Sequence, residues 1–77
     1  MKWKFKKNDL VLIDWIDITA ALHTDEEILP TNAQTVGWVQ ASTKQWVRIV
    51  TTKYLDGSDL TDQIVIPKGV IRNVTKM

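Results

Sequence analysis

Apolar and polar positions repeat with the period of a β-strand in several short stretches of the 77-residue chain. Residues 46–54 alternate, as expected when the two kinds of side chain lie on opposite faces of a strand. Residues 1–7 alternate too, which indicates a half-buried strand or an extended arm. Residues 10–18 are almost continuously apolar, which is typical of a strand covered on both faces or bent around a small barrel. Turn residues separate the predicted strands, which are 10–18, 35–41, 46–54, 63–66 and 70–76.

Residues 19–34 have neither the strand period nor the helix period. Within them, Thr24 and Glu27 have the spacing of a capping box, and Pro30 cannot continue a helix, so one or two helical turns are expected. The rest of the composition favours strands, because β-branched valine, isoleucine and threonine fill 25 of the 77 positions. The sequence therefore predicts one all-β domain over residues 1–77. We expect a small five-stranded antiparallel barrel with a long loop, and a short helix within it, after the first long strand.

Three positions are expected to have special backbone roles. Asn8 precedes the first long strand, and asparagine tolerates the left-handed conformation found at turns. Gly37 lies inside the second strand, where glycine is typical of a bulge or of a corner at which a barrel sheet bends. Gly69 follows Pro67 and Lys68 in a tight turn, and we expect it to adopt a conformation that other residues reach only at a cost.

Charge and composition exclude several classes of protein. Ten basic and nine acidic residues give a net charge of +1, which by itself identifies no partner. The chain contains no cysteine, so disulfides, thiolate metal sites and iron–sulfur clusters are excluded. The longest unbroken apolar stretch, residues 10–13, is far shorter than the ~20 residues of a membrane-spanning helix. With no secretory leader visible, we expect a cytoplasmic protein that does not contact membranes.

Catalytic and metal-binding chemistry has little support in the sequence. The only histidine, His23, lies in the long loop and both serines lie in predicted turns, so no nucleophile and base are expected to meet. The acidic run 25–27 beside His23 lacks the spacing of a metal site and fits a capped helix start better. Asp14 and Asp17 should point to opposite faces of their strand. We expect no enzyme activity, no metal site and no cofactor.

Three segments together resemble the pattern of a group of short, uncharacterised bacteriophage and prophage proteins. They are 14–17 (DWID), 35–38 (TVGW) and 62–71 (DQIVIPKGVI), and the resemblance spans roughly residues 9–77. The last segment is also similar to the fourth strand, turn and fifth strand of Sm-like (SH3-like) barrels. The resemblance implies an Sm-like barrel in the cytoplasm of the host bacterium, assembled as a homo-oligomer such as a ring. It also implies that Lys68 and Gly69 occupy the position that faces RNA in Sm rings.

The four tryptophans fall into two pairs. Trp15 and Trp38 have mainly apolar neighbours, so we expect them in the core or between two barrels rather than against a ligand. Trp3 and Trp46 each stand next to a basic or polar position, and aromatic and cationic side chains together bind single-stranded nucleic acid by stacking and charge neutralisation. The alternative for Trp3 and Trp46 is an amphipathic strand whose tryptophan covers an open barrel end.

Two functions remain open from the sequence. The first is a non-enzymatic module that binds single-stranded RNA or DNA, with the expected site residues Trp3, Lys4, Lys44, Lys68 and Gly69. The near-neutral charge opposes it, as does the absence of the Asp-x-x-Met-Asn element of Sm proteins, since residues 41–46 read ASTKQW. The second is a protein-binding adaptor or inhibitor directed at a host protein, or an assembly module. The tryptophans, the acidic loop and the balanced charge favour this second function.

Overall fold

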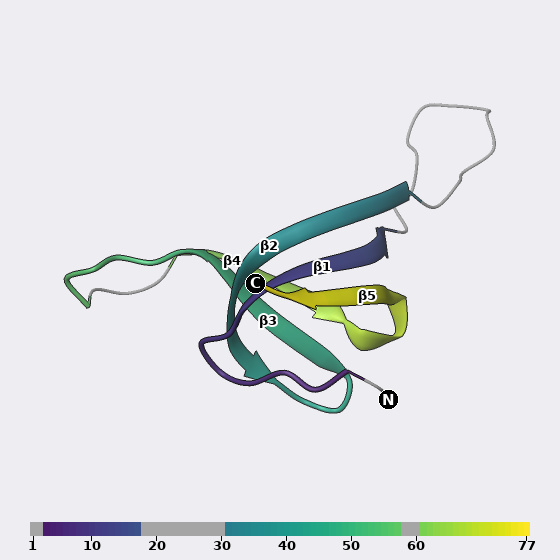
Figure 1. The fold of residues 1–77 in the computed structure, drawn as a ribbon, viewed down its shortest axis with the longest axis horizontal. Coiled ribbons are helices and arrows are strands. Elements are labelled where there is room, and N and C mark those ends of the chain that lie inside the picture. Colours follow the sequence, from purple (N-terminus) through teal and green to yellow (C-terminus); the bar gives the residue numbers. More distant parts are fainter. Residues whose placement is uncertain (1–2, 18–30, 58–60) are drawn as a thin grey trace.

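The computed structural model describes residues 3–17, 31–57 and 61–77, which form one antiparallel sheet in the order β4-β3-β2-β1-β5 (Figure 1). The strands are β1 (Leu10–Asp17), β2 (Thr31–Ser42), β3 (Trp46–Thr52), β4 (Thr61–Pro67) and β5 (Ile71–Lys76), and a short 3-10 helix, η1 (Lys68–Val70), joins β4 to β5. The prediction of an all-β chain with five antiparallel strands is confirmed. The helical turns expected within residues 19–30 lie outside the described residues.

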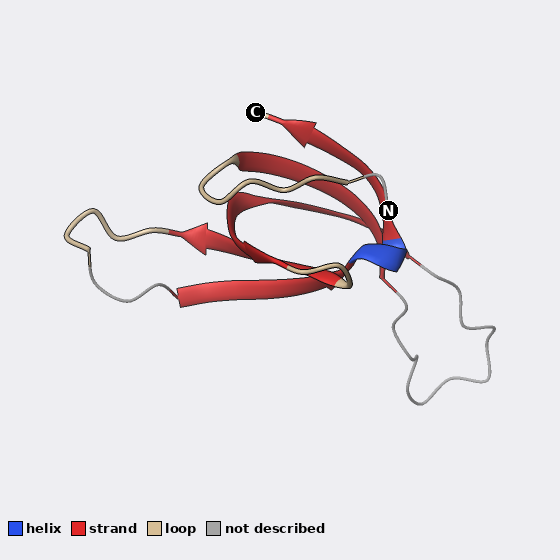
Figure 2. Cartoon of the chain, turned by 90° about the horizontal axis from the view of Figure 1, so that it is seen from below, coloured by secondary structure: helices blue, strands red, loops and turns tan. Residues whose placement is uncertain are grey.

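The sheet is bent but open (Figure 2). Strands β4 and β5 lie at its two margins and do not pair with each other, so the five described strands do not close into the expected barrel. Strand β5 instead returns to pair with β1, and the ladder continues to Met77, whose backbone N–H donates to the carbonyl oxygen of Leu10 at 2.9 Å. The sheet is therefore a curved layer whose two marginal strands each have one neighbour.

The bend is made by β2, which is the longest strand (Figure 1). Its first part pairs with β1 as far as Trp38, and from Trp38 to Ser42 it pairs with β3. The register shifts between Val39 and Ala41, and such a bulge bends the strand that carries it. One strand thus passes from one partner to the other, and the sheet folds over its own core.

Gly37 lies just before this bend and permits a close approach between β2 and β3. A Cβ atom at this position would lie 2.5 Å from Cγ2 of Ile49 and 2.6 Å from the carbonyl oxygen of Val50. Both distances are shorter than any ordinary contact, so a side chain here would force the two strands apart. The sequence associated Gly37 with a bulge or a corner of the sheet. The register shift instead lies between Val39 and Ala41, and glycine is required at position 37 because there is no space for a side chain.

The core lies on the concave face of the sheet and consists of β-branched side chains. Each contributes about 1.5 to 3 kcal/mol when it leaves water completely, so this cluster is the main source of stability. Its buried members are Val11, Ile13, Val39, Val47, Ile49, Ile66 and Ile71. Three aromatic side chains that are only half-buried, Trp3, Phe5 and Trp15, pack against this cluster.

Two local predictions are wrong. Strand β2 begins at Thr31 rather than at residue 35, because its polar first residues join β1 through backbone pairing that requires no apolar face. Gly69 does not have a positive φ; it lies in η1, and a Cβ atom there would meet nothing within 4 Å. The 3-10 turn reverses the chain with ordinary dihedral angles. The left-handed conformation expected for Asn8 is confirmed, with φ at 75°.

Candidate nucleic-acid interface

Residues 3–9 form an arm that packs on the core without pairing as a strand. Trp3 and Phe5 are half-buried against the core, whereas Lys4 is exposed between them, so the alternation seen in the sequence is preserved. The arm is fixed where β2 bends, because the backbone N–H of Asn8 donates to the carbonyl oxygen of Val39 at 2.8 Å. The two aromatic rings therefore have defined positions beside the sheet.

The turn between β2 and β3 is held by its own threonine. The hydroxyl oxygen of Thr43 accepts hydrogen bonds from the backbone N–H of Gln45 at 3.1 Å and of Trp46 at 3.2 Å. The backbone N–H of Thr43 donates to the carbonyl oxygen of Trp46 at 2.9 Å, which closes the turn. Lys44 is exposed at its tip. The position of Lys44 is thus fixed by a short turn with several hydrogen bonds.

Lys68 begins η1 and joins the end of β4 to this turn. Its backbone N–H donates to the carbonyl oxygen of Gln45 at 2.8 Å. Its side chain is only 8% exposed, which is unusual for lysine, and its Nζ lies 5.4 Å from the centroid of the Phe5 ring. The apolar stem is covered and the ammonium group is held by a cation–π contact rather than by a carboxylate.

These elements enclose a shallow pocket of about 500 Å³. Its lining residues, which we call the basic pocket, are Trp3, Lys4, Phe5, Ser42, Thr43, Lys44 and Lys68. Four of the five site residues expected from the sequence therefore come together: Trp3, Lys4, Lys44 and Lys68. Gly69 does not line the pocket. Phe5 also lines the pocket and was not among the expected site residues, although its alternation with Trp3 is visible in the sequence.

The charges of the chain are separated along the sheet. We call the end that carries residues 43–45 the turn end, and it holds the basic side chains Lys4, Lys44, Arg48 and Lys68. The described carboxylates do not line the basic pocket: Asp14 and Asp17 pair with the first part of β2, Asp56 and Asp62 lie by the turn between β3 and β4, and Asp9 forms an ion pair with Lys76 at 3.3 Å. Among the described residues, none of the three pocket lysines forms an ion pair. The near-neutral net charge thus conceals a positive end.

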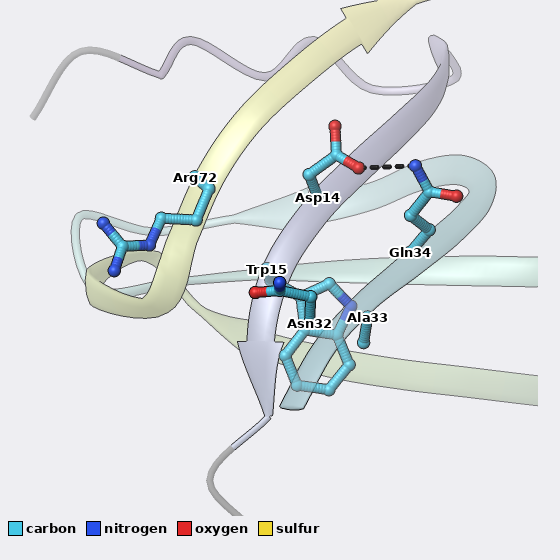
Figure 3. Close-up of a pocket in the computed structure, with 6 residues that line it drawn as sticks. All are labelled: Asp14, Trp15, Asn32, Ala33, Gln34 and Arg72. Carbon is cyan, nitrogen blue, oxygen red and sulfur yellow. Dashed lines mark hydrogen bonds between the residues drawn. The ribbon is translucent and has the colours of Figure 1, made fainter. Parts of the chain in front are cut away.

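A second pocket, of about 460 Å³, lies at the opposite end of β1 and β2 (Figure 3). It is lined by Asp14, Trp15, Asn32, Ala33, Gln34 and Arg72. The side-chain amide of Gln34 donates to the Asp14 carboxylate at 2.7 Å, while Arg72 points away from both. The indole N–H of Trp15 donates to the hydroxyl of Thr35 at 3.0 Å. A carboxylate at the rim repels phosphate groups, so this pocket suits nucleic acid less well than the basic pocket.

Of the three residues considered for catalysis, the structure describes Ser42. Ser42, in the basic pocket, donates its hydroxyl hydrogen bond to the carbonyl oxygen of Thr43 at 3.4 Å. His23 and Ser58 lie outside the described residues. In the part of the chain that the structure describes, no group of three acidic, histidine or cysteine side chains is placed to hold a metal ion, and no helix could span a membrane.

Trp38 and Trp46 lie on the convex face of the sheet, on the side opposite to the core. Trp38 pairs with Val50 in the register and does not join the core cluster. Of the two expectations for Trp38, the core position is therefore wrong, and a contact between two barrels stays a prediction. The Nζ of Lys53 lies 4.9 Å from the Trp38 ring centroid, and the guanidinium carbon of Arg48 lies 5.2 Å from that of Trp46. Trp15, in contrast, packs against the core as expected.

No protein family, no curated protein and no solved structure compared with this chain matches it.

Proposed function

We propose that this chain is a small non-enzymatic module that binds single-stranded nucleic acid in the basic pocket. The observation that carries the proposal is the grouping of three lysines and two aromatic rings around one shallow pocket, whose described lining residues include no carboxylate. Lysine ammonium groups neutralise phosphates, and aromatic rings stack on bases that are not already stacked in a duplex. Trp3 is the stacking platform, and Lys4, Lys44 and Lys68 contact the phosphates.

The shape of the pocket favours a single strand over a duplex. Rings that pack partly into a core can receive only a base that has left its own helix, because paired bases expose their edges and not their faces. A sequence-tolerant contact of this kind, with no base-edge recognition, is typical of proteins that bind single strands through stacking and charge. We therefore expect similar binding to RNA and DNA of the same length.

The test is a titration of labelled oligo-U and oligo-A at two salt concentrations. For the wild type, the logarithm of the association constant should fall with the logarithm of salt concentration by about 0.7 for each phosphate contacted. The variant Trp3→Ala should lose about 1 to 3 kcal/mol of binding free energy through lost stacking. Arg72→Gln is the matched control, since it removes one positive charge from the second pocket, and it should bind as the wild type does.

Absence of binding at low salt, where even weak electrostatic association is detectable, would refute the nucleic-acid proposal. It would favour the alternative, a protein-binding adaptor or inhibitor directed at a host protein. The observation that favours this protein-binding alternative is that Val36 and Val65 are 48% and 50% exposed on the convex face. They lie on β2 and β4 with β3 between them, and single exposed apolar residues are ordinary, so nucleic acid is the better supported partner.

The proposed setting follows from the resemblance to phage proteins and to Sm-like barrels, namely a phage-encoded homo-oligomer in the bacterial cytoplasm. Marginal strands are available for pairing between copies, because β4 and β5 each have one neighbour in the described sheet. Light scattering at micromolar concentration measures the mass directly. A monomer mass would argue against the Sm-like part of the proposal and would leave binding by the basic pocket intact.

A further inference from the structure

Trp46 and Arg48 form a second aromatic and cationic pair directly beside the basic pocket. Trp46 is the first residue of β3, and the Arg48 guanidinium carbon lies 5.2 Å from the centroid of its ring. Both side chains are half-buried and lie on the convex face, because the intervening Val47 is fully buried in the core on the other face. Across the sheet, Arg48 pairs with Val65, which is half-exposed. The pair is therefore partly open to solvent, whereas Val50, the next residue of β3 on the same face, is fully buried.

The turn at residues 43–45 connects this pair to the basic pocket. Thr43 lines the pocket and is also bonded through its backbone and its hydroxyl to Trp46. Lys44, at the tip of the same turn, belongs to the pocket lining and is exposed. A strand that leaves Trp3 and crosses the tip of the turn would meet a phosphate-binding lysine on the way to the second aromatic ring.

The convex face offers a natural comparison in Lys53 and Trp38, whose Nζ to ring-centroid distance is 4.9 Å. This pair has the same chemistry and lies on the same face, but it stands near the turn between β3 and β4, where Asp56 and Asp62 lie. Of the two, only the pair of Trp46 and Arg48 is at the turn end, where the charged side chains that the structure describes are basic. Position, and not the cation–π contact itself, distinguishes the two pairs.

We propose that Trp46 and Arg48 form a second stacking subsite for the same nucleic-acid strand, which passes from the basic pocket over residues 43–45 onto the convex face. The inference rests on the proposed function and extends it from one pocket to a path. One base stacks on the Trp46 and Arg48 pair, since both an indole ring and a guanidinium plane accept a base. The remaining N–H groups of Arg48 donate to a phosphate, and Lys44 neutralises the phosphate that crosses the turn.

The test is a titration of the wild type and three variants with a series of oligo-U molecules of increasing length, from two nucleotides upward. The wild type should bind more tightly with length until the path is filled. Arg48→Gln should bind the shortest oligomers as the wild type does but lose about 5- to 100-fold affinity for the longer ones. Lys53→Gln, which removes the cation of the comparison pair, should bind oligo-U of every length with the wild-type affinity. Far-ultraviolet circular dichroism and thermal melting verify that each variant is folded.

Arg48→Lys separates the two roles of the arginine. It keeps the charge, so the salt dependence for long oligomers should equal that of the wild type, while affinity falls because the planar group is lost. For Arg48→Gln the salt slope should also become shallower by about 0.7, the value of one phosphate contact on a single strand. A merely structural role for Arg48 would weaken short and long oligomers alike and leave the slope unchanged.

The outcomes separate this inference from the proposed function. Two results would contradict the second subsite while leaving binding in the basic pocket intact. In the first, wild-type affinity stops increasing at the oligomer length that fills the basic pocket. In the second, Arg48→Gln and Lys53→Gln have the same affinity at every oligomer length. Absence of wild-type binding at every length would overturn both. Loss confined to long oligomers in Arg48→Gln, with Lys53→Gln unchanged, supports the path.

Discussion

Gly37 and the basic pocket show two opposite uses of the same small sheet. At Gly37, β2 and β3 approach so closely that a Cβ atom would lie 2.5 Å from an isoleucine methyl group, and the neighbours are apolar side chains and backbone. At the turn end, three lysines lie around half-buried aromatic rings, and the part of the chain that the structure describes adds no carboxylate to the pocket lining. The first arrangement stabilises the fold through packing. The second gathers positive charge at one surface, which is expected where an anionic partner supplies the opposite charge.

The largest effect is expected at Gly37. Gly37→Ala should lower the free energy of unfolding by about 3 kcal/mol, at the upper end of the range for overpacked interiors, because the added methyl group meets both Ile49 and the Val50 carbonyl. Urea unfolding followed by tryptophan fluorescence measures the change. Oligonucleotide binding per folded molecule should stay as in the wild type. A variant as stable as the wild type would show that β2 and β3 can separate at little cost. It would contradict the conclusion that lack of space requires glycine at position 37.

Lys68 tests the opposite region, where the expected change is in binding. Lys68→Met keeps an apolar stem over Phe5 and removes the charge, so the salt slope for oligo-U should become shallower by about 0.7. The free energy of unfolding should change by less than about 0.5 kcal/mol, because loss of the cation–π contact is offset by reduced repulsion among the lysines. Lys68→Ala, which also removes the buried stem, should cost about 1 kcal/mol more than Lys68→Met. A salt slope unchanged in Lys68→Met would remove Lys68 from the interface.

Gly69 should give the smallest effect of the three. Gly69→Ala should alter the free energy of unfolding by no more than about 0.5 kcal/mol, because its φ is ordinary and a Cβ atom there has open space. Binding should also be unchanged, since Gly69 does not line the basic pocket. Thermal melting and the oligo-U titration measure both. A clear loss of affinity would instead support the role for Gly69 that the resemblance to Sm proteins implies.

The sequence predicted the strands well because their signal is local. Alternation and β-branched runs identified five strands, and the interruption at Asn8 identified the first turn. The start of β2 was missed because Thr31 to Gln34 are held by backbone pairing with β1, which leaves no apolar pattern. The open form of the sheet was missed as well, since closure depends on whether β4 and β5 meet, and no local pattern reports that.

The candidate site was predicted in part for the same reason. Lysine beside an aromatic residue, or lysine in a turn, is visible in the chain, and this identified Trp3, Lys4, Lys44 and Lys68. Their convergence, and the distance of the described carboxylates from them, depend on strand register, which composition cannot give. Gly69 was included by analogy alone, and Phe5 was left out although Lys68 contacts it. Whether these residues bind nucleic acid stays a prediction.

The hydrogen bond from the Lys68 backbone N–H to the Gln45 carbonyl oxygen has a kinetic consequence. It joins η1 to the turn that carries Lys44, directly beside the pairing of Trp46 with Pro67, so local opening of this end of the β3–β4 ladder separates two of the three pocket cations. An amide hydrogen held in this way exchanges with solvent only during local opening, at a rate that reports the population of the open state. The exchange lifetime of the Lys68 amide therefore measures how often the basic pocket is assembled, in the free protein and with a strand bound.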